Sequence, residues 1–235
     1  MSDDINSLKF NDPDRYLLSL FVGNPAERAA ILAFDELNVE IARLRDTIET
    51  PHMGLIRLQW WKDEIKKIYA GEKFAPHQVL QDVARALARY KIPQEDVHRL
   101  ITGREADFED YDSFDIFAYA RTIHAPLLKI KAGILNEDRN TDALAKAYAL
   151  VGLLRAIPFY RARSQVLIPS IQPEPVEKIC KRAEDLLNAN TATHRYFKAH
   201  DVLTRLYLQQ IKSTGYQPEK LKPLAFKELR LWWGV

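Results

Sequence analysis

The chain has 235 residues, of which 47% are hydrophobic, and its formal net charge is +2. This composition excludes an intrinsically disordered chain and provides enough length to bury a sizeable core. The near balance of charge gives no electrostatic case for nucleic acid as the main partner, and the single Cys180 excludes an intrachain disulfide.

The N-terminal sequence MSDDINSLKFNDPDR has no basic start followed by an apolar run. We therefore expect neither a signal peptide nor a transit peptide. The longest apolar stretches, such as 147–154, are shorter than the roughly 20 residues that a membrane-spanning helix needs. These features predict a cytoplasmic protein of bacterial type, with at most peripheral contact with the inner membrane.

Two long helices between residues 25 and 71 dominate the first part of the chain. Apolar residues at spacings of three and four run from Phe34 to Ile48, and again from Leu58 to Ile68. The first helix also carries a polar row of Asn38, Ala42 and Arg45 beside its apolar stripe. We expect that row to lie near the edge of the core, where a functional cleft can form.

Further helices follow from the same spacings and from capping residues. They are predicted over residues 14–22, 77–90, 94–111, 113–135, 142–163, 176–188 and 194–212, with Ser113 and Thr141 as N-caps. Pro126 and Pro158 are expected to kink or interrupt two of them, and the three prolines of 166–175 predict a loop. No window alternates with period two, so the chain is predicted to be all-α, with about eight to ten helices in a single bundle-like domain over residues 1–235.

Standard catalytic signatures are absent from the sequence: there is no Gly-rich phosphate loop, no CxxC pair and no HExxH. The six histidines show no i, i+4 pairing, and each is interpreted as a surface or satisfied core residue. Cys180 lies in a charged helix without an identifiable partner base, so we interpret it as a small apolar core residue.

Two stretches, NVEIARLRD…GLIRLQWWKDEIKKIYAG and LVGLLRAIPFYRARSQVLIP, give the chain a specific resemblance. It resembles the squalene/phytoene synthase family over roughly residues 14–170, whereas the helices of 171–235 are divergent. The resemblance implies an all-α isoprenoid-synthase fold around an apolar cavity. It also implies two aspartate-rich helices whose carboxylates hold Mg²⁺ ions and, through them, a prenyl diphosphate.

The sequence departs from the family pattern at both aspartate motifs. The first motif falls on Ala42, Arg43 and Asp46, one turn after Asn38. The second falls on Gly152, Arg155, Ala156 and Tyr160. Asp46 is the one carboxylate left of five. By resemblance, no metal site and no catalytic residue is expected at these positions, because the Mg²⁺ ligands are missing.

Within the family, the replaced segments look most like the branch that includes a mitochondrial complex I assembly factor and its alphaproteobacterial relatives. The resemblance implies a non-catalytic protein that assists assembly of respiratory complex I and has a complex subunit or another assembly protein as partner. Two alternatives stay open. One is a Mg²⁺-dependent transferase joining two prenyl diphosphates head to head, and the other is a prenyl- or lipid-binding module without turnover.

The motif residues, the tryptophans and the arginines can also have a purely structural role. Arg43 and Asp46 can form an ion pair on a solvated helix face, and Gly152 and Ala156 can allow close approach of two helices. Trp60 and Trp61 are interpreted as core and core-edge residues. A set of arginines can be surface charges or an anion site: Arg43, Arg57, Arg155, Arg161 and Arg163.

The C-terminal segment 223–235 combines apolar side chains with Lys and Arg. One interpretation is a final helix that closes the core. The other is an exposed aromatic anchor, because Trp beside basic residues suits a membrane interface or a groove on a partner.

Overall fold

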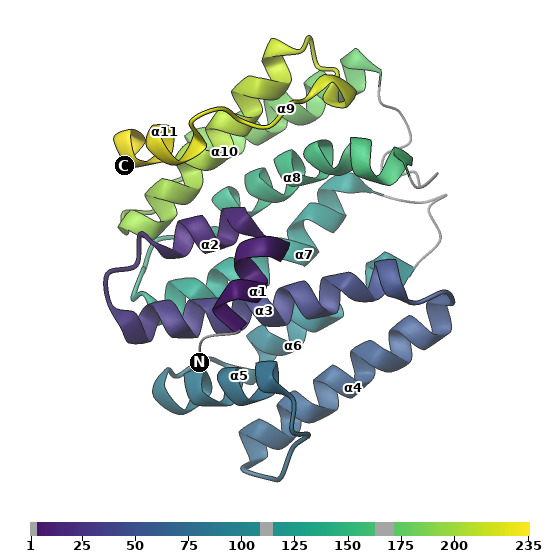
Figure 1. Cartoon of the computed structure of the whole chain (residues 1–235), viewed down its shortest axis with the longest axis vertical. Helices are drawn as coiled ribbons and strands as arrows, with labels where there is room; N and C mark the ends of the chain where they lie inside the picture. Colours follow the sequence, from purple (N-terminus) through teal and green to yellow (C-terminus); the bar gives the residue numbers. More distant parts are fainter. Residues whose placement is uncertain (1–3, 109–114, 163–171) are drawn as a thin grey trace. The chain divides into compact units, whose positions relative to one another are not determined.

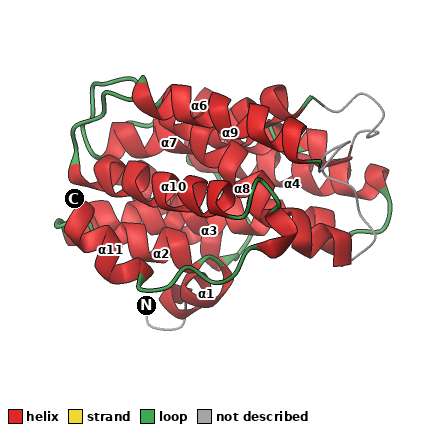
Figure 2. Cartoon of the chain, turned by 90° about the horizontal axis from the view of Figure 1, so that it is seen from above, coloured by secondary structure: helices red, strands yellow, loops and turns green. Residues whose placement is uncertain are grey.

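A computed structural model describes residues 4–108, 115–162 and 172–235. In these residues it contains α-helices and short 3₁₀-helices and no strand, as Figure 2 shows. The described residues form two compact units, and their division falls at Pro126, inside one helix. Unit 1 is Met1–Glu109 with Pro126–Asp138, and unit 2 is Asp110–Ala125 with Arg139–Val235. The all-α prediction is confirmed, whereas the single domain over 1–235 stays a prediction.

Unit 1 is built from six helices, a 3₁₀ turn and the second part of a seventh helix (Figure 1). These are α1 (Asp4–Asn11), α2 (Pro13–Ser19), α3 (Pro25–Thr47), α4 (Pro51–Ala70), α5 (Gln78–Arg89), α6 (Gln94–Thr102), η1 (Glu105–Phe108) and α7 (Ile116–Ile134). Helix α3 packs against α1, α2, α4, α5 and α6, and α4 packs against α5, α6 and η1. Helix α3 is therefore the central element of this unit.

The residues at the ends of α3 and α4 explain where these helices begin and stop. The Asn24 side chain accepts a hydrogen bond from the Ala26 backbone N–H at 2.9 Å, and Pro25 and Pro51 occupy the first helical positions, where no intrahelical N–H is needed. Gly71 ends α4 with φ of 71°, a left-handed conformation that glycine adopts without a steric cost. Helices α3 and α4 lie where the sequence predicted two long helices between residues 25 and 71.

The predicted apolar stripes form the core of unit 1. Phe34, Leu37 and Ile41 on α3 are fully buried. On α4 the buried members are Leu58, Trp61 and Ile65. The C-terminal ends of both stripes, at Leu44, Ile48 and Ile68, are only half-buried, so the core does not extend to the last turn of either helix.

Unit 2 contains the first part of α7 and the C-terminal helices (Figure 1). These are α8 (Asp142–Ala162), α9 (Pro173–Asn188), α10 (Arg195–Ser213), η3 (Pro218–Lys220) and α11 (Lys227–Gly234). Helices α8, α9 and α10 pack against one another, and α11 packs on α10. By length and composition α8 is apolar enough to span a membrane, but half of its most apolar window is buried inside the protein, and core helices of soluble proteins have the same composition.

Several predicted boundaries are wrong. The helix predicted over 94–111 ends at Thr102 and is followed by a 3₁₀ turn. Helix α9 begins at Pro173 and not at Val176, because prolines are tolerated in a first turn. Pro126 and Pro158 lie inside helices that continue past them, so neither proline interrupts its helix; the kinks expected there stay a prediction.

Helix α1 was not predicted. Thr141 directly precedes α8, the position predicted for its N-cap, and its backbone carbonyl accepts from the Ala145 N–H at 2.9 Å. Ser113 lies outside the described residues, and the Asp115 side chain accepts from the Phe117 N–H at 2.8 Å at the start of α7. At the start of α8, next to Thr141, the Asn140 side chain accepts from the Asp142 N–H at 2.8 Å.

Candidate functional site on helix α3

One row of α3 carries polar side chains into the interior of unit 1. Asp35, Asn38, Ala42 and Arg45 recur at spacings of three and four, so they share one face of the helix. Asp35 is fully buried and Asn38 is 3% exposed, and the Arg45 side chain is 7% exposed. The predicted row therefore begins one turn earlier than expected, at Asp35.

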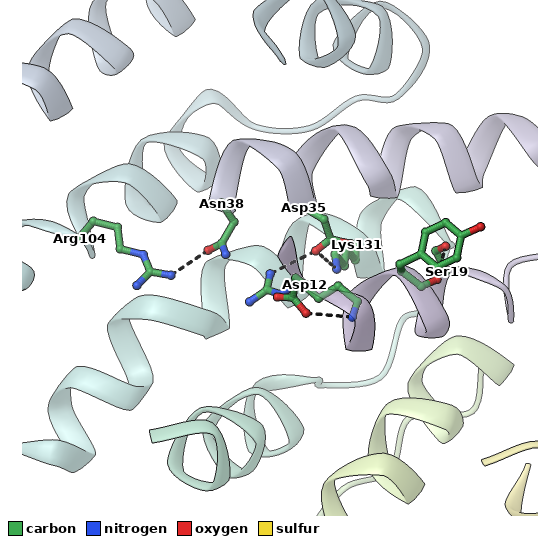
Figure 3. Close-up of polar contacts among 8 residues, drawn as sticks. Asp12, Ser19, Asp35, Asn38, Arg104 and Lys131 are labelled. Atoms are coloured by element: carbon green, nitrogen blue, oxygen red, sulfur yellow. Dashed lines mark hydrogen bonds and ion pairs between the residues drawn. The ribbon is translucent and has the colours of Figure 1, made fainter. Parts of the chain in front are cut away.

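Asp35 is the centre of a buried group of charges (Figure 3). Lys131 on α7 donates to Asp35 Oδ1 at 2.6 Å, and Arg15 on α2 donates to the same oxygen at 3.1 Å. The Arg15 guanidinium also pairs with Asp12, with Nε to Oδ2 at 2.8 Å. Two acids thus face two bases, which offsets part of the cost of removing them from water. The group ties α2 and α7 to α3.

Burial changes the proton affinity of this group. It lowers the pKa of Lys131 to about 8, although the neighbouring Asp35 carboxylate raises it. Burial also raises the pKa of Asp12, against the opposing effect of Arg15. The Lys131 side chain is 1% exposed, so it does not reach a substrate. We conclude that the group stabilises the unit and is not a nucleophilic centre.

The second half of the row joins α3 to η1. Arg104 donates to Asn38 Oδ1 at 3.1 Å (Figure 3) and lies 3.5 Å from Asp107 Oδ2. Arg45 lies 3.8 Å from Asp107 Oδ1. The Asp107 side chain is 2% exposed, so a buried carboxylate is shared by two guanidinium groups. This part of the row therefore holds the paired guanidinium groups of Arg45 and Arg104. A metal-binding helix needs carboxylates that are free to bind the ion.

A close approach of α4 to η1 positions Asp107. A Cβ built on Gly54 would lie 2.1 Å from the Phe108 ring, so only glycine fits at this point of α4. The ring of Phe108 occupies that space, and it follows Asp107 directly in the chain. Gly54 therefore has a packing role in the candidate site.

The other residues of the predicted first motif lie toward solvent. Arg43 and Asp46 are exposed, and Ala42 is half-buried. Arg43 pairs with Glu40 at 3.6 Å, one turn before it on the same face. The expected pair of Arg43 with Asp46 stays a prediction.

The predicted second motif forms one partly exposed face of α8. Its members, Gly152, Arg155, Ala156 and Tyr160, are all half-buried. A Cβ on Gly152 would meet no atom of the described residues within 4 Å, so the expected close helix packing there is wrong. The Arg155 guanidinium lies 3.3 Å from the centre of the Tyr207 ring on α10, a cation–π contact.

The predicted anion-binding arginines belong to different units of the structure. Arg43 and Arg57 belong to unit 1 and are exposed, whereas Arg155 and Arg161 belong to unit 2. Arg163 lies outside the described residues. A shared anion site of these side chains stays a prediction.

The structural interpretations of the aromatic residues and the cysteine hold. Trp61 is buried and Trp60 half-buried, with ring centres 5.0 Å apart. Cys180 is fully buried, and burial raises the pKa of its thiol to about 12. His124 and His200 are buried core residues that both contact Tyr148, at 4.7 Å and 4.2 Å between ring centres, and lie 5.7 Å from each other.

Sequence reasoning missed Asp35, Lys131, Arg104 and Asp107. A signal existed for Asp35, because it continues the row of Asn38, Ala42 and Arg45 at the same spacing. None existed for Lys131, which lies 96 residues from Asp35 in the chain. Among residues 4–108, 115–162 and 172–235, no group of three or more His, Cys, Asp or Glu is placed to hold a metal ion.

Sequence comparison matches residues 8–172 to the family described as squalene/phytoene synthase. The human protein named NADH dehydrogenase (ubiquinone) complex I, assembly factor 6 is 30% identical over 172 residues, which cover 69% of this chain and 50% of that protein. The protein of the same name from Bos taurus gives the same values. The match thus spans about half the length of these relatives.

Structural comparison finds similar folds among solved isoprenoid synthases. A dehydrosqualene synthase in complex with ligand gives a TM-score of 0.76 at 12% identity, covering 97% of this chain and 92% of the other. Squalene synthase HpnC from Alicyclobacillus acidocaldarius gives a TM-score of 0.72 at 20% identity, covering 92% and 95%. These likenesses establish an isoprenoid-synthase-like helical fold.

Proposed function

We propose a function from one premise: the chain belongs to the squalene/phytoene synthase family. Within that family, we propose that it is a non-catalytic member which assists the assembly of respiratory complex I. It then acts through contact with a subunit of the complex or with another assembly protein, and it needs no metal ion.

The observation that carries this proposal is the state of the polar row on α3. Ionisation of a prenyl diphosphate requires Mg²⁺ held by free carboxylates. On this row the oxygen of Asn38 accepts from Arg104, and Arg45 is paired with the buried Asp107. A guanidinium in this place repels a divalent cation, so transition-state stabilisation by metal is lost.

The names of the relatives support the assembly role. Proteins named complex I assembly factor 6 match this chain at 30% identity over 69% of its length. The solved enzymes match it at 12% and 20% identity. The sequence is therefore more similar to assembly factors than to these two synthases, although the fold is common to all.

The proposal predicts no turnover of prenyl diphosphates. With farnesyl or geranylgeranyl diphosphate and Mg²⁺, we expect the purified chain to release diphosphate no faster than buffer, while an active squalene synthase serves as the positive control. In a host strain lacking the chain, we expect less assembled complex I and lower NADH dehydrogenase activity, both restored by the wild-type gene. Robust diphosphate release contradicts the non-catalytic function, and unchanged complex I in the deletion strain contradicts the assembly role.

A second candidate function is binding of a prenyl or lipid diphosphate without turnover. The observation that favours it is the partly exposed face of α8, where Gly152 is open and Arg155 is present. Titration calorimetry with pyrophosphate is the test. For this function we expect binding that is independent of Mg²⁺ and weakened about tenfold or more in Arg155→Gln, since one guanidinium–phosphate contact is lost. Binding that requires Mg²⁺, or that Arg155→Gln leaves unchanged, contradicts it.

A further inference from the structure

Helix α11 presents an apolar face that the rest of the chain leaves exposed. Leu229 and Trp233 are four residues apart and so lie on one side of this short helix. Phe226 is the N-cap residue that directly precedes the helix. The exposed fractions of Phe226, Leu229 and Trp233 are 74%, 59% and 91%. We call these three residues the α11 apolar face. Three large exposed side chains within eight residues of the chain are of the kind that marks an interaction site.

The opposite side of α11 is fixed to unit 2, so the face has a defined orientation. Leu231 is fully buried, and a Cβ on Gly234 would lie 2.7 Å from Val202 Cγ1 on α10. The Arg195 guanidinium of α10 lies 5.2 Å from the ring centre of Trp232. Helix α11 therefore packs on α10 (Figure 1), and Leu229 and Trp233 stay exposed.

The segment around the α11 apolar face has more basic than acidic residues. Residues 218–235 contain four basic residues, Lys220, Lys222, Lys227 and Arg230, against the two acids Glu219 and Glu228. The segment thus carries a net charge of +2 (4 − 2). Arg230 and Lys222 are exposed, so this charge is available to an outside partner.

We propose that α11 binds an anionic lipid bilayer, with the α11 apolar face in the headgroup region and the basic residues at the phosphates. Tryptophan beside Lys and Arg suits the boundary between water and lipid. A protein groove would bury the α11 apolar face without requiring the surrounding positive charge, which is why the lipid surface is the better match. The helix is short, so binding is shallow and reversible and depends on both contributions. This inference does not rest on the assembly function.

Co-sedimentation of the full chain with vesicles tests the proposal. We expect binding to vesicles of phosphatidylcholine with about one third phosphatidylglycerol, weak binding to phosphatidylcholine alone, and loss of binding as salt is raised. In the triple variant Phe226→Ser, Leu229→Ser and Trp233→Ser, affinity should fall about tenfold or more. Lys222→Gln with Arg230→Gln should weaken it about fivefold per charge removed.

Control measurements distinguish lipid binding by α11 from binding of a protein partner and from misfolding of the variants. The matched control is Phe10→Ser, which removes an equally exposed phenyl ring, 80% exposed, from α1 and should leave vesicle binding unchanged. Helix content and melting temperature of the triple variant should equal those of the wild type. Equal binding to neutral vesicles, binding unaffected by the triple variant, or binding to native membranes but not to protein-free vesicles would overturn the proposal; the last result would identify a protein partner.

Discussion

Replacing Asp35 with leucine is expected to lower the free energy of unfolding by about 3–5 kcal/mol. The carboxylate is fully buried and accepts from Lys131 at 2.6 Å and from Arg15 at 3.1 Å. Without it, the cations Lys131 and Arg15 remain in the interior and lose the carboxylate that both of them contact. Denaturant unfolding at neutral pH measures the loss.

Two further variants make this prediction specific to buried charge. Glu40→Leu makes a similar change on the same helix, but the Glu40 side chain is 33% exposed and pairs with the exposed Arg43, so we expect a loss below about 1 kcal/mol. The double variant Asp35→Leu with Lys131→Met removes one acid and one base together. It should be more stable than Asp35→Leu alone, since an ion pair replaced as a unit costs less than a stranded charge. A double variant that is less stable than the single one argues against the charge balance.

Lys131 is expected to make the stability of the chain depend on alkaline pH. Its pKa is lowered to about 8 in the folded state from 10.5. Between these two values the unfolded chain holds the proton and the folded chain does not, so stability rises with pH in this window. We expect the free energy of unfolding of the wild type, measured relative to Lys131→Met, to increase by about 2 kcal/mol from about pH 7 to about pH 10.

The comparison with Lys131→Met is needed because other groups act in the opposite direction. The pKa of Cys180 is raised by burial to about 12 from 9.0, so its contribution to stability is lost as pH rises above about 9. That loss is the same in both proteins and cancels in the difference. Unfolding curves in denaturant at several pH values give both free energies. Parallel pH profiles of the two proteins would show that Lys131 keeps its ordinary proton affinity.

The helices were predictable because their evidence is local. The stripe from Phe34 to Ile48 is a periodic signal, and Asn24, Pro51 and Gly71 mark helix ends through their own backbone and side-chain preferences. The end of α6 at Thr102 was missed, since the charged residues after it fit a helix as well as a turn. Here tertiary contacts decide: Phe108 fills the space over Gly54, and this contact holds η1 out of a continuous helix.

The candidate site was predictable only in part. The sequence contains the row of Asn38, Ala42 and Arg45, and the same spacing extends to Asp35. The partners of that row come from distant segments, as with Lys131 and Arg104, and no local pattern connects them. A resemblance to a family locates motif positions, but it does not show whether a residue such as Arg43 points inward or into solvent.

The discontinuity of unit 1 has a consequence for folding during synthesis. The unit is made of both Met1–Glu109 and Pro126–Asp138. Its buried Asp35 pairs with Lys131, which is 96 residues later in the chain. A ribosome must therefore release more than half of the chain before this N-terminal unit completes its interior charge balance. Because this contact joins residues far apart in the sequence, it can form only late in synthesis. The α3 helix is thus made early, whereas its buried ion pair is completed late.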